Sequence, residues 1–250
     1  MKRVLPVLVL LLALGGAVFV ATRPDPYNQS GQIARLFGTD PFFRKDNLSD
    51  LPLLEFPAKT RPNDCLVILF AGDGGWKGLV DVLARHFAAA GTPVVGLNSA
   101  DYFNVTRSPA DIARVVERIS RNFGHVWRRK KIILMGYSFS AEVLPFAYNA
   151  LPPAVQPYIA RVVMLAPSNW ADFKSSPIYY YSPKTSLQVA PELRKMPPAK
   201  LLIVCDNTKY SIRRALPPRA ALPVVLLDVN HNFNGRYAWL AGLLARKLGL

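Results

Sequence analysis

From residue 65 onward, short apolar runs alternate with longer stretches in which apolar residues recur at helical spacing. The runs carry Val, Ile and Leu almost without interruption, which is typical of strands buried on both faces of a parallel sheet. The runs predict six strands: Cys65–Phe70, Pro93–Leu97, Lys131–Met135, Arg161–Leu165, Leu201–Val204 and Val224–Leu227.

The longer stretches between these runs predict amphipathic helices. In one of them Ser108 provides an N-cap, Pro109 takes the first helical position and Asp111 lies in the first turn. The expected helices are 76–90, 108–123, 139–150 and 236–248. Strand, helix and strand in this order imply right-handed crossovers. We therefore expect a doubly wound α/β fold, in which helices flank a mostly parallel sheet of about six strands.

Three segments depart from this alternation and set the expected domain limits. Residues 1–21 join a basic start to an apolar run, which is typical of a signal peptide or of an N-terminal membrane anchor. Residues 22–64 are expected to be a linker and an irregular lead-in to an α/β domain at 65–250. Inside that domain, residues 169–198 show neither strand nor helix pattern and include Tyr179–Tyr181. An insertion of this length predicts a lid or a substrate wall.

The composition and net charge of the chain limit the kinds of molecule that it could bind. The chain has 250 residues, of which 51% are hydrophobic, enough for the core of one domain. Its net charge of +15 could attract nucleic acid, an anionic membrane or acidic substrates. The sequence shows no nucleic-acid-binding motif, so nucleic acid is not expected. The charge either serves solubility alone or attracts a phospholipid surface, to which the N-terminal apolar segment already directs the chain.

The two cysteines are not expected to form a disulfide. Cys65 opens one predicted strand and Cys205 closes another, so they would lie at opposite ends of a parallel sheet. We expect two free, buried thiols. No metal and no cofactor are expected.

The sharpest local signal for chemistry is a serine between a strand and a helix. The strand 131–135 leads into Gly-Tyr-Ser-Phe-Ser at 136–140, and a predicted helix follows directly. This context is typical of a nucleophile elbow, in which Ser138 lies on a strained turn and its neighbours two positions away must be small. Gly136 meets this requirement, and Ser140 replaces the usual second glycine. The alternative interpretation is that Ser138 only caps the helix.

A glycine-rich loop after the first predicted strand indicates an oxyanion hole. It reads Ala-Gly-Asp-Gly-Gly-Trp at residues 71–76. Glycines let the backbone approach a substrate closely, and loops at this position donate a backbone N–H to the oxyanion. We expect the N–H groups of Gly74, or of its neighbour, and of Phe139 to form the hole. A phosphate-binding loop fits less well because the Gly-Lys-Ser/Thr ending is missing, and a purely structural turn stays open.

The order of residues along the chain selects a base and an acid for Ser138. In this type of site the histidine follows the last strand, and of the three histidines only His231 does so. The acid is expected after the preceding strand, where Asp206 is found; it would orient His231 and stabilise its imidazolium form. Asp228 and Asp172 remain alternatives.

Five parts of the sequence carry a family resemblance: Gly72–Trp76, Gly136–Phe139, Val143–Asn149, Val189–Leu193 and His231. Together they resemble the bacterial virulence protein family of VirJ and AcvB, which is part of the α/β-hydrolase superfamily. The resemblance covers roughly residues 65–245, and its runs are more specific than general hydrolase features. This sequence has Ser140 where the family usually has Gly, and Glu142 where it usually has Asp.

The resemblance implies a periplasmic protein associated with type IV secretion in plant-associated bacteria. It also implies hydrolysis of lysyl-phosphatidylglycerol, with Ser138 and His231 as catalytic residues. A lysyl group carries two ammonium groups, so Asp73 and Glu142, which flank the predicted nucleophile, could form an acidic wall that recognises it. Glu142 could equally be a charge on the surface of its helix.

Three functions are therefore weighed, although the short and polar region 169–198 argues mildly against the third, a general carboxylesterase or lipase with a long-chain tunnel. The first is a periplasmic serine esterase that acts on an aminoacylated phospholipid. The second is a non-catalytic chaperone or adaptor with a hydrolase-like fold, which would escort secretion substrates to a membrane channel. The complete set of Ser138, Asp206 and His231 favours the enzyme, because a scaffold has no need to retain it.

Overall fold

A computed structural model of the chain describes residues 40–175, 186–216 and 222–250. Residues Arg44–Leu250 form one compact unit. Before it, the Phe43 N–H donates a hydrogen bond of 3.1 Å to the carbonyl of Asp40. Across these described ranges, every helix is too short or too polar to cross a bilayer. The expected signal peptide or anchor at 1–21 lies outside the described residues.

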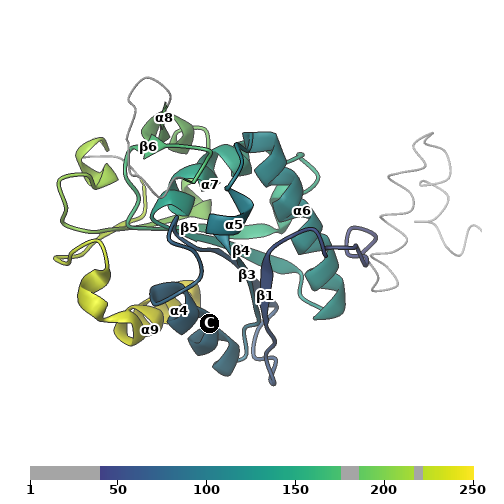
Figure 1. Ribbon diagram of the computed structural model, residues 1–250. Helices are drawn as coiled ribbons and strands as arrows, with labels where there is room; N and C mark the ends of the chain where they lie inside the picture. The colour runs from purple at the N-terminus through teal and green to yellow at the C-terminus, as the bar shows by residue number, and fades with distance from the viewer. Residues whose placement is uncertain (1–39, 176–185, 217–221) are drawn as a thin grey trace, which may run out of the picture. The chain divides into compact units, whose positions relative to one another are not determined.

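The unit is built on a seven-stranded sheet with the strand order β1-β3-β2-β4-β5-β8-β9 (Figure 1). All neighbours pair in parallel except β1 and β3. The six predicted strands are present, and their ends differ from the prediction by one or two residues at most. The strands are β1 Leu53–Phe56, β2 Cys65–Phe70, β3 Val94–Leu97, β4 Lys131–Tyr137, β5 Ile159–Leu165, β8 Leu201–Cys205 and β9 Val224–Leu226.

Strand β1 corrects the prediction for the lead-in. Residues 22–64 were expected to be irregular, but Leu53–Phe56 pair antiparallel with β3, in a register that places Leu53 opposite Leu97. Four residues between Pro52 and Pro57 are too few to show alternation in the sequence. Such a short strand forms because the edge of β3 offers it hydrogen-bonding partners, and its own propensity contributes little.

Helices cover both faces of the sheet. Figure 1 shows α4 and α9 on one face and α6 and α7 on the other. Helix α4 packs against α9, α6 against α7, and α7 against α8. This arrangement confirms the expected doubly wound α/β fold. The helices are α4 Leu79–Ala89, α5 Ser99–Tyr102, α6 Pro109–Val126, α7 Phe139–Ala150, α8 Val189–Leu193 and α9 Tyr237–Leu248.

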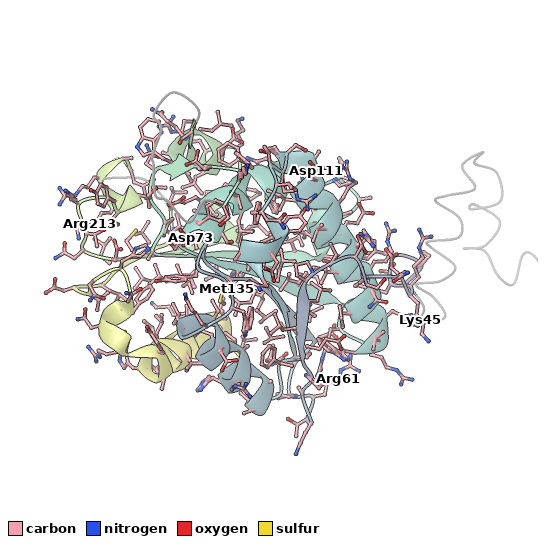
Figure 2. The ribbon with its side chains drawn as sticks, viewed as in Figure 1. Lys45, Arg61, Asp73, Asp111, Met135 and Arg213 are labelled. Carbon is pink, nitrogen blue, oxygen red and sulfur yellow. The ribbon has the colours of Figure 1, made fainter. Side chains whose placement is uncertain are left out.

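A large cluster of apolar side chains fills the core between the sheet and the pair α4 and α9. Phe87, Leu244 and Met135 are each 0% exposed in it. In Figure 2, Met135 lies in the interior, whereas Arg61 and Arg213 lie at the periphery. Burial of each such large side chain contributes roughly 1.5–3 kcal/mol to folding. The sheet is therefore a rigid base for the loops at its carboxyl edge.

Helix α4 begins three residues later than the sequence pattern indicates. Gly75 and Gly78 have φ values of 79° and 56°, and both therefore lie in the left-handed region. Glycine adopts this conformation without steric cost. The loop after β2 thus stays non-helical up to Gly78, which keeps its backbone at the carboxyl edge of the sheet.

The insertion at 169–198 contains more regular structure than expected. Trp170–Ala171 (β6) pair antiparallel with Leu187–Gln188 (β7), and helix α8 follows directly. The prediction of neither strand nor helix is wrong for these residues, because elements of two to five residues are too short to produce a periodic pattern. The three tyrosines at Tyr179–Tyr181 lie outside the described residues.

The two cysteines are free, as expected. Cys65 starts β2 and Cys205 ends β8, so they lie at opposite ends of the parallel sheet. Cys205 is buried and Cys65 is half-buried. Burial raises the pKa of both thiols, which keeps them protonated and weakly reactive.

Candidate active site

The loops that carry the predicted site residues meet at one edge of the sheet. The glycine loop follows β2, Ser138 follows β4, Asp206 follows β8 and His231 follows β9. Because these strands are parallel, their carboxyl ends face the same side, where open α/β sheets bind their ligands. Residues 93 positions apart, Ser138 and His231, are thereby brought into contact.

Ser138 lies on a strained turn between β4 and α7. Its φ and ψ of 55° and −123° are unusual for a residue with a Cβ atom. A Cβ on Gly136 would lie 2.8 Å from the carbonyl carbon of Ser140, so the turn requires glycine there. The expected elbow is therefore present, and Ser138 lines a cavity at this edge of the sheet.

Ser140 occupies the position where the second glycine of the elbow is usually found. Its side chain is 0% exposed, and its Oγ lies 2.8 Å from the Oγ of Ser99 at the start of α5. Each hydroxyl satisfies the other in a site without access to water. The hydroxyl in place of glycine thus joins the helix that follows Ser138 to α5.

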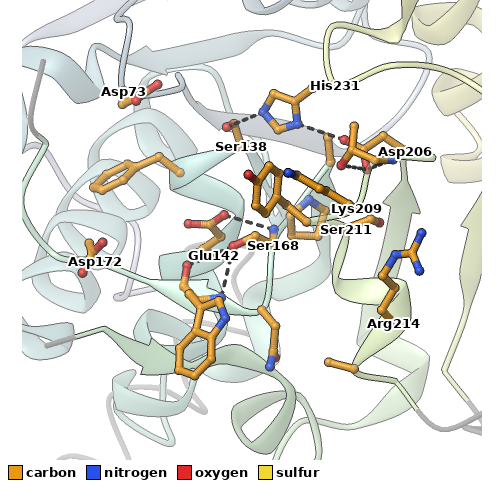
Figure 3. A pocket seen from close by; sticks show the side chains of 18 of the residues that line it. Asp73, Ser138, Glu142, Ser168, Asp172, Asp206, Lys209, Ser211, Arg214 and His231 are labelled. Carbon is orange, nitrogen blue, oxygen red and sulfur yellow. Dashed lines mark hydrogen bonds and ion pairs between the residues drawn. The ribbon is translucent and has the colours of Figure 1, made fainter. Parts of the chain in front are cut away.

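Ser138, His231 and Asp206 form a continuous hydrogen-bonded relay (Figure 3). The Ser138 Oγ lies 2.7 Å from His231 Nε2, and His231 Nδ1 lies 2.9 Å from Asp206 Oδ2. A carboxylate accepts only, so Nδ1 carries the proton and Nε2 is the acceptor for the serine hydroxyl. This is the tautomer in which histidine can act as a base for serine.

Asp206 is well suited to hold His231 in that tautomer, since its side chain is 1% exposed. Burial alone would raise the pKa of the Asp206 carboxyl. Hydrogen bonds from His231 and Thr208 outweigh burial, so the pKa lies below its ordinary value and the carboxylate stays ionised. The two alternative acids, both among the described residues, do not hydrogen-bond to His231. Asp228 accepts a hydrogen bond from Asn207 and Asp172 accepts one from Ser186, each at 2.7 Å.

Tyr137 supports the loop of His231, a role the sequence did not reveal. Its hydroxyl donates to Asn232 Oδ1 at 2.8 Å and lies 3.2 Å from the carbonyl oxygen of His231. The two rings lie with their centroids 5.6 Å apart. Burial, with nearby negative groups such as Asp73, raises the pKa of Tyr137 to about 12, so the phenol remains a donor. The only signal in the sequence was its place next to the nucleophile.

The glycine loop presents Asp73 to the site. The Gly75 N–H donates to the carbonyl of Gly72 at 3.0 Å, which places Asp73 and Gly74 at the tip of a tight turn. Asp73 and Phe139 line the cavity, whereas a Cβ on Gly74 would point at Lys77. Of the two expected oxyanion donors, Phe139 thus lies at the site, and the neighbour of Gly74 faces it.

A cavity of about 940 Å³ opens above Ser138. Its wall includes Asn169, Trp170 and Asp172, so the described part of the insertion at 169–198 forms part of the cavity wall. The structure adds residues that carried no motif in the sequence, because they come from irregular segments after β5 and β8. They are Ser168, Asn169, Trp170, Lys174, Lys209, Tyr210, Ser211 and Arg214.

Glu142 faces this cavity and is not a charge on the helix surface. It is 6% exposed, and its Oε1 accepts a hydrogen bond of 3.0 Å from the Ser168 N–H. Together with Asp73 and Asp172 it gives the cavity carboxylates besides that of Asp206. Among the described residues, no group of His, Cys, Asp and Glu has the arrangement of a metal site.

Residues 64–249 match the model of a family described as "Bacterial virulence protein (VirJ)". The chain belongs to this family. The match covers most of the VirJ-family chain and includes every element that carries Ser138, Asp206 and His231. A comparison with curated proteins gives no significant match.

Solved structures show the fold of the VirJ-family chain. An α/β serine hydrolase homologue from Coxiella burnetii has 19% identity and a TM-score of 0.50, covering 78% of this chain and 90% of that one. Est1E from Butyrivibrio proteoclasticus has 11% identity and a TM-score of 0.54, covering 81% and 95%. An esterase domain from a Rhodothermus marinus protein has 13% identity and a TM-score of 0.51, covering 78% and 91%. The chain therefore has the α/β-hydrolase fold.

Proposed function

We propose that the VirJ-family chain is a serine hydrolase of carboxylic esters, and that its substrate is an aminoacyl ester of a phospholipid such as lysyl-phosphatidylglycerol. The relay from Ser138 through His231 to Asp206 carries the proposal. Its contacts of 2.7 and 2.9 Å allow proton transfer without rearrangement. A relay of this kind at the wall of a large cavity has no structural task that simpler packing would not perform.

The chemistry follows from the geometry. His231 Nε2 removes the hydroxyl proton as the Ser138 Oγ attacks the ester carbonyl carbon, and the backbone N–H groups of Phe139 and the turn at 73–74 stabilise the oxyanion. His231 then gives its proton to the leaving alcohol, so the acyl group remains on Ser138. Water, deprotonated by His231, attacks this acyl-enzyme, releases the acid and restores the hydroxyl.

The carboxylates of the cavity support an acyl group that carries positive charge. Asp73, Glu142 and Asp172 lie in the wall around Ser138, although the protein as a whole is strongly basic. A lysyl group has two ammonium groups, whose attraction to carboxylates grows where water is displaced. The aminoacyl ester is also an activated ester, which suits transfer to a serine.

The proposed site of action is the periplasmic face of the inner membrane. The basic and apolar start of the chain is typical of a signal peptide or an anchor, and the net charge of +15 favours an anionic phospholipid surface. The proposed partners are therefore membrane phospholipid and, from the resemblance of the sequence to the family of VirJ and AcvB, proteins of a secretion system.

The test compares the purified protein with its Ser138→Ala variant on vesicles that contain lysyl-phosphatidylglycerol. We expect release of lysine by the first protein, and a loss of activity of about 10⁴-fold or more in the variant, because the attacking oxygen is missing. Mass spectrometry of the lipids measures the outcome. If both proteins leave the lipid intact, while secretion substrates still bind to both, the adaptor is the function.

A further inference from the structure

Charged side chains of the cavity are divided between two sides of Ser138. Figure 3 places Asp73 and Asp172 on one side, and Lys209 and Arg214 on the other. The basic pair belongs to the segment after β8, which begins with Asp206. The acidic pair comes from the loop after β2 and from the residues after β6. A ligand that spans the site therefore meets opposite charges at its two ends.

The basic segment is held in place by hydrogen bonds. The Ile212 N–H donates to the carbonyl of Pro167 at 2.9 Å, and Ser211 forms a β-bridge with Ser168. The Ile212 side chain is 0% exposed, which fixes the short helix Ile212–Arg214 to the body of the domain. The backbone at Arg214 thus has a defined position beside the cavity.

The two basic side chains are available for a ligand. Within the ranges that the structure describes, neither Lys209 nor Arg214 takes part in an ion pair, in contrast to Arg118, which pairs with two aspartates. The Lys209 Nζ lies 4.9 Å from the centre of the Tyr210 ring, a contact that leaves its N–H donors free. Guanidinium and ammonium groups together are the usual ligands of phosphate oxygens.

The reaction decides which part of the ester meets the basic pair. His231 has to protonate the leaving oxygen, so the alcohol lies on the side of His231 and Asp206. Lys209 follows Asp206 by three positions and lies on that side. Lys174, the other basic residue of the wall, comes from the segment of Asp172 and is not part of this pair.

We infer that Lys209 and Arg214 form a subsite for a phosphate group on the alcohol part of the ester. The inference rests on the proposed hydrolase function and adds to it a determinant of specificity. The subsite favours esters whose leaving alcohol carries a phosphate over neutral esters with the same acyl group. Because both side chains are exposed, salt weakens this preference.

The test uses two esters that differ only in this phosphate, 1-acetylglycerol and 1-acetyl-sn-glycerol 3-phosphate. We expect the ratio of kcat/KM for the phosphate ester to that for the neutral ester to fall about tenfold in the Lys209→Gln/Arg214→Gln variant, mainly through KM. The matched control is Lys130→Gln/Lys131→Gln. It removes the same charge at the amino end of β4, the end opposite to Ser138, and keeps the ratio.

An equal loss on both esters in the Lys209→Gln/Arg214→Gln variant would overturn the subsite and leave the hydrolase in place. If the unaltered protein cleaves neither ester, the proposed function fails on these substrates, and calorimetric binding of sn-glycerol 3-phosphate decides the subsite separately. Binding that is lost in the variant and kept in the control supports the subsite. Equal binding by all three proteins refutes it.

Discussion

Tyr137 illustrates how a residue next to Ser138, the proposed nucleophile, acts through another residue. Its side chain points from the end of β4 to the loop of His231, and it holds that loop through Asn232. The base itself is half-exposed and has Asp206 as its only charged anchor among the described residues. Tyr137 therefore serves as a positioning residue that limits the motion of the imidazole.

We expect Tyr137→Phe to lower kcat on esters about tenfold while KM stays nearly constant. The ring still packs, but the loop of His231 loses a hydrogen bond of roughly 0.5–1.5 kcal/mol. Steady-state kinetics measures the change. Since the pKa of Tyr137 is raised to about 12, the phenol stays protonated at lower pH and adds no step of its own to the pH profile there.

Tyr148→Phe is the matched control, because Tyr148 is a buried tyrosine of α7 that makes no hydrogen bond to the loop of His231. It should leave kcat unchanged. A Tyr137→Phe protein in which KM rises and kcat is kept would show that Tyr137 contacts the substrate and does not position the base.

For individual residues, the sequence revealed the roles that follow from the order of residues along the chain. It did not reveal the roles that depend on contacts between distant residues. Ser138, Asp206 and His231 could be predicted because each follows a particular strand. The partner of Tyr137 lies 95 residues away, and no pattern links the two positions. Lys209 and Arg214 were missed as well, because they lie in an irregular segment where no sequence pattern indicates that they face the cavity.

Among the elements, the turn from β4 into α7 sets the position of Ser138, the proposed nucleophile. The strand ends in Gly136, whose missing side chain lets the helix return closely over the strand. The helix then begins at Phe139, so its first N–H groups have no partner within the helix and face the cavity edge. Strand β4, the turn and helix α7 together thus fix the position of Ser138.

We predict that Gly136→Ala disrupts the turn between β4 and α7. Its Cβ would lie 2.8–2.9 Å from backbone atoms of Ser140 and Ala141, which cannot move without displacing α7. Overpacking of this kind costs typically about 1–3 kcal/mol. We expect a lower midpoint in urea unfolding and a loss of esterase activity of about 100-fold or more, as misplacement of a catalytic atom is costly.

Gly242→Ala provides the comparison within another helix. There the new Cβ would lie 3.6 Å from the Arg246 side chain, an ordinary contact, so the change should stabilise α9 by roughly 0.5–1 kcal/mol. An unchanged midpoint and full activity in Gly136→Ala would show that the turn tolerates a side chain and would contradict the proposed constraint.

Elements with a continuous apolar run or a clear helical period were predictable, even one as short as β9, and short elements without such a pattern were not. Strand Cys65–Phe70 and helix Phe139–Ala150 occur with the predicted limits. A continuous apolar run is typical of a buried strand, and apolar residues at helical spacing are typical of a helix. Strand β1, the pair β6 and β7, and helix α8 have five residues or fewer. Their structure is decided by neighbours in space, and the sequence window around them contains too little information.

At the scale of the whole molecule, the excess of Lys and Arg is the property with the widest reach. Charges spread over a surface act on any large anionic body, and their effect falls off within about 10 Å at ~0.1 M salt. The proposed substrate lies in such a body. A basic protein would therefore reach its ester by first concentrating at the membrane.

The corresponding prediction concerns vesicles. The chain from residue 22 onward should sediment with vesicles of anionic phosphatidylglycerol at ~50 mM salt and dissociate at ~500 mM, because counterions screen the attraction. It should not sediment with neutral phosphatidylcholine. The Ser138→Ala variant has the same charge and should behave identically. Binding to both lipids regardless of salt would indicate apolar insertion as the cause.

The margins of the sheet have a consequence for how the protein behaves at high concentration. Strand β1 is enclosed by Pro52 and Pro57, and β9 has three residues and follows Pro223. Proline lacks an N–H, and such short borders offer few free backbone groups to an incoming chain. Both edge strands therefore offer little backbone to which a strand of another copy could hydrogen-bond, and this disfavours aggregation through the sheet edges.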